Sequence, residues 1–92
     1  MTEHERLTLI EALIAVGIFT SRGTRPDHLI AHVGNTNWTL TRIRQQHVTG
    51  DPRRIWQGQS ADKTTLPMDT EETADFLSWQ HPDRRAADAR LM

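Results

Sequence analysis

The 92-residue sequence predicts a mainly α-helical domain that carries one small β-hairpin. Three observations predict this fold class. An apolar stretch at helical spacing lies near the start of the chain, two short helix-like stretches separated by a glycine lie in the middle, and two short strand-like runs follow Pro52. Together they predict a three-helix core, a hairpin and a C-terminal helical segment within a single domain over residues 1–92.

The first helix is predicted over residues 1–19. Thr2, followed three residues later by Glu5, has the pattern of a capping box at the start of a helix. Behind it, eight of the chain's 19 Leu, Ile, Val and Phe residues lie between Leu7 and Phe19, many of them at helical spacing. A helix that is apolar around so much of its circumference is buried on several sides, so we expect a second subunit to cover part of it.

Residues 26–47 are predicted to form two helices that meet at Gly34. Pro26 suits the first position of a helix, because its fixed φ is helical and its missing N–H has no partner there. Gly34 ends this helix, since glycine readily adopts the positive φ found after helices. Thr36 then caps a further helix over residues 36–47.

Residues 29–42 also carry a recognisable motif. Their sequence is Leu-Ile-Ala-His-Val-Gly-Asn-Thr-Asn-Trp-Thr-Leu-Thr-Arg, with the glycine, the threonine cap and the final Thr-Leu-Thr-Arg in register with Leu-Ala-x-x-Leu-Gly-Val-Ser-x-x-Thr-Val-Ser-Arg. The latter pattern is that of helix-turn-helix DNA-binding proteins, which this stretch resembles. Two positions depart from it: Ile30 stands where a small residue is usual, and Asn35 replaces an apolar residue.

A hairpin is predicted over residues 53–67, where two short runs with strand character flank a polar loop. With this hairpin the chain is similar to winged-helix proteins, and the resemblance implies a winged helix-turn-helix-like fold. After the hairpin, Asp69 and Glu72 form a second capping box. They begin a C-terminal helical segment that is predicted over residues 69–91.

Charge is divided unevenly along the chain, although the formal net charge is −1. Residues 1–20 carry −2, residues 21–63 carry +4, and residues 64–92 carry −3. A basic centre between acidic flanks favours an anionic polymer as partner, because neutralised phosphates supply most of the non-specific affinity for nucleic acid. An ordinary solvated surface is the other interpretation of this pattern.

The resemblance implies a sequence-specific double-stranded DNA-binding protein, a transcriptional regulator that reads the major groove with the helix at 36–47. We expect it to bind as a homodimer that is joined through its N-terminal and C-terminal helices. The residues predicted to contact bases or phosphates are Thr36, Asn37, Trp38, Thr41, Arg42, Arg44, Gln45, Arg53, Arg54 and Lys63.

Two other functions stay open. The first is a protein-interaction module on the same winged-helix scaffold, an adaptor or a phage-type inhibitor of a protein machine. The acidic C-terminal segment and the weak overall basicity favour it. The second is an architectural or recombination accessory factor, which binds DNA in order to bend it.

The sequence indicates no enzyme, cofactor or metal. The absence of cysteine excludes disulfides, thiolate catalysis and cysteine-based zinc sites. His28 and His32 have a spacing that can hold a metal on a helix, but no third ligand accompanies them, so we predict no metal site. The longest apolar run is too short to span a bilayer, and the acidic N-terminus is unlike a signal peptide. A cytoplasmic protein with no membrane partner is therefore predicted.

Overall fold

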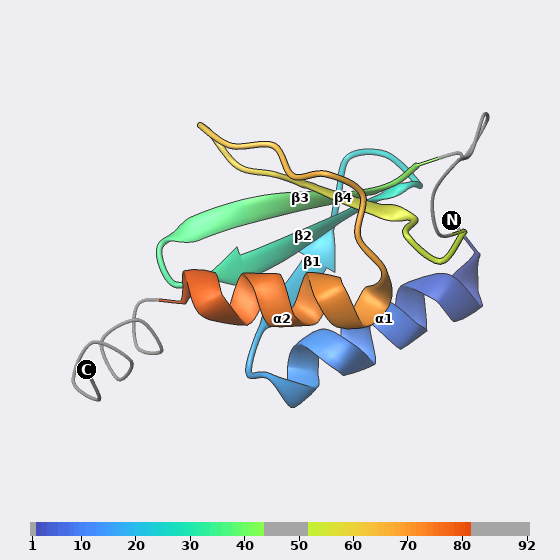
Figure 1. The fold of residues 1–92 in the computed structure, drawn as a ribbon, viewed down its shortest axis with the longest axis horizontal. Helices are drawn as coiled ribbons and strands as arrows, with labels where there is room; N and C mark the ends of the chain where they lie inside the picture. The colour runs from blue at the N-terminus through green and yellow to red at the C-terminus, as the bar shows by residue number, and fades with distance from the viewer. Residues whose placement is uncertain (1, 44–51, 82–92) are drawn as a thin grey trace.

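The computed structural model of the protein describes residues 2–43 and 52–81. Over these residues the chain forms two helices and four strands, in the order α1 (Glu3–Ala15), β1 (Phe19–Arg22), β2 (His28–Val33), β3 (Thr36–Arg42), β4 (Trp56–Gln59) and α2 (Thr70–Gln80). The strands form one antiparallel sheet in chain order, β1-β2-β3-β4. Both helices lie on the same face of this sheet, and no described helix covers the opposite face (Figure 1).

The predicted helix-turn-helix is wrong, and with it the mainly α-helical, winged fold class and the three-helix core. The described part of residues 26–47 forms β2 and β3. A two-residue turn at Gly34 and Asn35 joins these strands and leaves Val33 opposite Thr36. Gly34 has a φ of 59°, which suits a tight hairpin turn as well as the end of a helix.

Burial with a period of two residues explains why this segment forms strands. Alternate side chains along the hairpin are buried beneath the helices: Leu29, Ala31, Val33, Trp38 and Leu40. The side chains between them point to the opposite face, and apart from Ile30 they are polar. The β-branched and aromatic residues of the segment also favour a strand.

The hairpin predicted over residues 53–67 is present in a different form. β4 pairs with β3 as the fourth strand of the sheet, and the chain then returns along the outer edge of β4. Trp56 and Met68 exchange two backbone hydrogen bonds, of 2.9 and 2.8 Å, and the Thr65 N–H donates to the Gly58 carbonyl at 2.8 Å. This segment therefore covers one edge of the sheet instead of projecting as a wing.

Both helices begin with the capping boxes that the sequence predicts. The Thr2 hydroxyl accepts from the Glu5 N–H at 3.1 Å, while the Glu5 carboxylate accepts from the Thr2 N–H at 2.9 Å. Asp69 and Glu72 make the same pair of bonds at 2.7 and 3.1 Å.

Residues 82–91 of the predicted C-terminal helical segment lie outside the described residues. Neither described helix has the length and apolar character needed to cross a bilayer.

The first helix is shorter than predicted, because the chain turns sharply at Gly17. This glycine has a φ of 81°, and β1 begins two residues after it. Leu9 and Leu13 of α1 are fully buried, as is Leu77 of α2. The predicted homodimer conflicts with this fold, since the two helices that were to join subunits pack against each other and against the sheet of their own chain.

Replacing Leu77 by alanine is expected to lower the free energy of unfolding by about 2–5 kcal/mol, because the substitution leaves a cavity in the core. Leu66→Ala is the matched control. The Leu66 side chain is 84% exposed whereas that of Leu77 is 0% exposed, so the control is expected to change stability by less than about 0.5 kcal/mol. Urea denaturation followed by tryptophan fluorescence measures both variants, and equal losses would contradict this core.

Candidate functional site

The predicted DNA-binding residues do not form one surface. Thr36 and Asn37 are exposed at the start of β3. Trp38, the next residue along β3, is buried on the helix side of the sheet. Its ring packs edge-on against that of Phe76 at a centroid distance of 5.4 Å. A side chain held in this way is unavailable to a DNA groove.

Two of the predicted DNA-binding cations are paired within the chain. Arg42 Nη2 donates to Glu5 Oε2 at 3.0 Å, and Arg54 Nε donates to Glu72 Oε1 at 2.9 Å. Arg42 thus joins β3 to the capping-box glutamate of α1. Arg54 joins the segment that precedes β4 to the capping-box glutamate of α2. These two ion pairs therefore use cations that were predicted to contact DNA.

The remaining predicted residues are scattered. Thr41 is partly buried on the uncovered face, while Arg53 and Lys63 are exposed in the segments before and after β4. Arg44 and Gln45 lie outside the described residues. Because residues 36–42 form a strand, the predicted recognition helix is wrong, and DNA binding itself stays a prediction.

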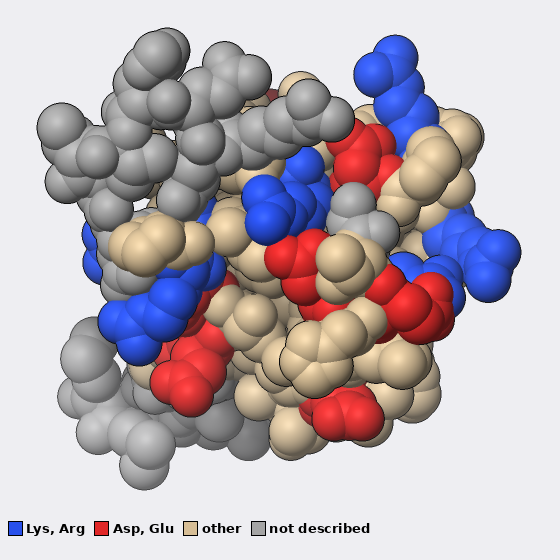
Figure 2. Space-filling model, turned by 90° about the vertical axis from the view of Figure 1, so that its right-hand side faces the viewer, with Lys and Arg blue, Asp and Glu red and all other residues tan. Residues whose placement is uncertain are grey.

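The side of the molecule shown in Figure 2 carries both signs of charge. Lys and Arg side chains are interspersed there with Asp and Glu side chains, and they do not gather into one basic area. The helices contribute strongly to the negative charge, because α1 and α2 together contain six carboxylates and one arginine. The positive charge of the middle segment in the sequence does not become a basic face on this side.

The uncovered face of the sheet is polar, and its side chains bond to one another. His32 lies between two partners: its Nδ1 is 2.9 Å from Asn37 Oδ1, and its Nε2 is 2.8 Å from the Ser21 hydroxyl. Since an amide oxygen only accepts, Nδ1 carries the proton and Nε2 accepts from Ser21 when the ring is neutral. This face therefore satisfies much of its own hydrogen bonding.

The histidine spacing does not produce a metal site. His28 and His32 both lie on the uncovered face of β2. On a strand, residues four apart are separated by about 13 Å, whereas on a helix they would be neighbours. Among residues 2–43 and 52–81, no group of three His, Cys, Asp or Glu side chains is placed to hold a metal ion.

The two edges of the sheet differ in what covers them. The chain's own segment at 64–68 bonds to the outer edge of β4. β1 forms the other edge and pairs only with β2. Within the described part of the chain, no backbone hydrogen bond reaches β1 from its outer side.

The ladder shows which groups of β1 face outward. Phe19 lies opposite His32, and Ser21 lies opposite Ile30. In β2, Ala31 lies between His32 and Ile30. The two-residue turn makes Val33 and Thr36 a hydrogen-bonded pair, and every second residue of β2 from there, including Ala31, bonds to β3. Phe19 and Ser21 therefore bond to β2, and the backbone N–H and C=O groups of Thr20 and Arg22 point away from the sheet. None of these four groups has a described partner.

Three exposed apolar residues lie near the turn from α1 into this edge, and the register places Phe19 beside His32 on the uncovered face of the sheet. Ile14, Val16 and Phe19 have exposed fractions of 55%, 41% and 73%, and they flank the turn at Gly17. We call these three residues the apolar turn cluster. In the sequence, the first predicted helix carries more apolar residues than one buried face needs. This excess indicated these exposed residues, but it was interpreted as a contact with a second subunit along a longer helix.

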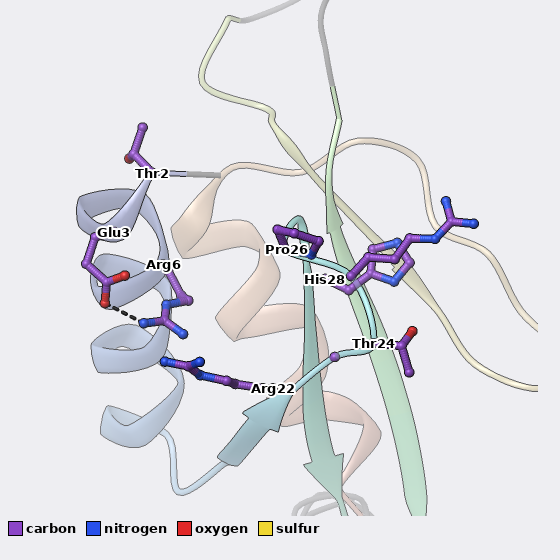
Figure 3. A pocket seen from close by; sticks show the side chains of 9 residues that line it. Thr2, Glu3, Arg6, Arg22, Thr24, Pro26 and His28 are labelled. Atoms are coloured by element: carbon purple, nitrogen blue, oxygen red, sulfur yellow. Dashed lines mark hydrogen bonds and ion pairs between the residues drawn. The ribbon is translucent and has the colours of Figure 1, made fainter.

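A pocket of about 450 Å³ lies at the other end of β1 (Figure 3). The first turns of α1 and the loop from β1 to β2 line it, with Thr2, Glu3, Arg6, Arg22, Gly23, Thr24, Arg25, Pro26 and His28. The loop requires glycine at position 23, because a Cβ there would lie 2.5 Å from the His28 Cβ. Sequence analysis missed this pocket, since its two walls come together only through the packing of α1 on β1.

Comparison with protein-family models, with curated proteins and with solved structures finds no match for this chain. The free edge of β1, the apolar turn cluster and the pocket are therefore the features of the molecule from which a function can be inferred.

The Glu5–Arg42 ion pair predicts a stability that depends on pH. The backbone N–H of Thr2, and then the hydrogen bond from Arg42, lower the pKa of Glu5 below its ordinary value of 4.5. A lowered pKa in the folded state means that this stabilisation is present above pH 4.5 and is lost as the pH falls below it.

Glu5→Gln keeps the capping box but removes the charge. We expect it to lower the free energy of unfolding at pH 7 by about 1 kcal/mol or less. The difference from the native protein is expected to be smaller at pH 3 than at pH 7, as measured by urea denaturation at both pH values. Glu11→Gln, at an exposed position without a described partner, is the control and is expected to show no difference. A loss of equal size at both pH values for Glu5→Gln would contradict this role.

Proposed function

We propose that this protein is a protein-interaction module that adds one extended segment of a partner protein to the outer edge of β1. The single observation that carries the proposal is the contrast between the two edges of the sheet. The chain covers the edge of β4 with its own residues 64–68, and it leaves the outward backbone groups of Thr20 and Arg22 without a described partner. Strand addition is a recurring mode of peptide recognition in which backbone hydrogen bonds supply affinity.

The apolar turn cluster supports this proposal by supplying a contact for side chains. On an added antiparallel strand, the residue opposite Phe19 would have its Cβ about 4.5–5.5 Å from that of Phe19. The exposed ring would then be covered by an apolar side chain of the partner. We therefore expect the bound segment to carry an apolar residue at this position.

Charge favours a protein segment over a nucleic acid at this edge. The helix that leads into β1 contains three glutamates and one arginine, and α2 adds three further carboxylates on the same layer. The carboxylates of this layer repel an extended phosphate backbone, which needs several cations along its path, whereas β1 itself offers only Arg22. A mostly neutral extended peptide meets no such repulsion.

The proposal is tested first by removing one outward N–H. Thr20→Pro deletes a donor that faces away from β2, and edge strands accept proline at such positions. Peptides are selected from a random-sequence display library on the native protein, and their affinities are then measured by isothermal titration calorimetry. We expect Thr20→Pro to weaken the selected peptides by about tenfold or more, which corresponds to about 1.4 kcal/mol.

Thr20→Val is the matched control, because it keeps the N–H and the branched shape of the side chain. It is expected to bind the same peptides within about twofold, a difference of less than about 0.5 kcal/mol. Thermal unfolding verifies that both variants are folded. If the library yields no peptide, or if the selected peptides bind Thr20→Pro as tightly as the native protein, the proposal is wrong.

A second test removes the side-chain contact. Phe19→Ala is expected to weaken the selected peptides by about tenfold, while stability to urea stays within about 0.5 kcal/mol because the ring is exposed. Leu66→Ala provides the control, as another exposed apolar side chain on the opposite edge. Equal weakening by both substitutions would show that the peptides do not lie along β1.

A further inference from the structure

Two arginines from separate elements converge on the pocket beside β1. Arg6 extends from α1, and Arg22 extends from the end of β1 toward the same space, so that their guanidinium groups lie near each other (Figure 3). Arg22 is opposite Leu29, whose side chain is buried on the helix side of the sheet, and this register directs Arg22 toward α1. The meeting of the two cations is thus a consequence of the fold.

The residues that line this pocket carry more positive than negative charge. Glu3 forms an ion pair with Arg6. The side chains of Arg22 and Arg25 have no described hydrogen bond or ion pair. With His28 neutral, the three arginines and one glutamate of the lining carry a net charge of +2. Because like charges at close range repel, a bound anion would stabilise this arrangement.

We propose that this pocket binds a phosphomonoester group. A phosphomonoester carries a charge of about −1.5 to −2 at pH 7, which matches the excess charge of the lining better than a single carboxylate does. Guanidinium groups present a planar fork of N–H donors that bonds two phosphate oxygens at once. Arg6 reaches this space from α1 and Arg22 reaches it from β1, whereas the Thr24 side chain points away from their guanidinium groups (Figure 3).

This site goes beyond the proposed strand addition and does not require it. Arg22 takes part in both through different atoms, since its backbone faces the free edge and its side chain faces the pocket. A phosphorylated side chain of a protein and a nucleotide would both present the same group. The two sources differ only in what surrounds the phosphate.

The test uses the isotopically labelled full chain and three probes at constant ionic strength: inorganic phosphate, O-phosphoserine and adenosine monophosphate. We expect saturable shifts of the Arg6 and Arg22 side-chain N–H signals and of the Gly23 amide in NMR titrations. Tighter binding of phosphoserine than of the nucleotide would support the proposal and assign the site to modified proteins. The reverse order would support it and assign the site to nucleotides. Shifts that do not saturate, or that spread equally over all cations, would overturn it.

Substitutions then identify the pocket as the source of binding. Arg22→Ala is expected to weaken phosphate binding by at least tenfold, and Arg22→Lys by less, because lysine keeps the charge but loses the fork. Lys63→Ala is the matched control, since this exposed cation lies outside the pocket and is expected to leave the affinity within twofold. Equal affinity of Arg22→Ala and the native protein would overturn the proposal.

A second variant tests the pocket without the risk of unfolding the protein. Thr24→Glu places a negative charge on the exposed loop without removing any core contact, and it is expected to weaken binding by at least tenfold. Unchanged binding by this variant would also count against the site. Thr20→Pro is expected to bind phosphate within twofold of the native protein, so that failure of the phosphate site and failure of strand addition give different results.

Discussion

The alternating burial along the hairpin of β2 and β3 is the constraint on which the rest of the structure depends. One side of this hairpin supplies five of the buried apolar side chains of a small core, and both helices pack on that side. Because the chain has so few large apolar residues, it cannot cover both faces of a sheet. The opposite face is therefore polar, and its side chains bond to one another.

A sheet built in chain order around such a hairpin has two outer strands, and the chain treats them differently. After β4 the backbone doubles back as far as Met68 before α2 begins, which covers that edge. Before β1 the chain arrives directly from α1 through the turn at Gly17, and no described segment covers the other edge. The free edge of β1 follows from this short connection. The apolar turn cluster lies at one end of β1 and the pocket at the other.

The two capping boxes were predicted correctly, because their signal is local. Both capping boxes involve residues three apart, and the hydrogen bonds of each box are made within one turn. The central segment was assigned wrongly because two periods fit it. Leu29, Ile30 and Val33 have helical spacing, whereas Leu29, Ala31 and Val33 alternate. Packing against α1 and α2 decides between the two periods, and that contact comes from elsewhere in the chain.

The candidate site could not be predicted for the same reason, since each of its parts depends on which element lies next to β1. Thr20 is unremarkable in the sequence, and only the register with β2 shows that its N–H faces outward. Arg6 and Arg22 were counted in segments of opposite net charge, and the packing of α1 on β1 brings them together. Arg22 then belongs to the edge through its backbone and to the pocket through its side chain. The two proposed sites therefore share one residue but use different atoms of it, so each site can be tested without removing the groups that the other one uses.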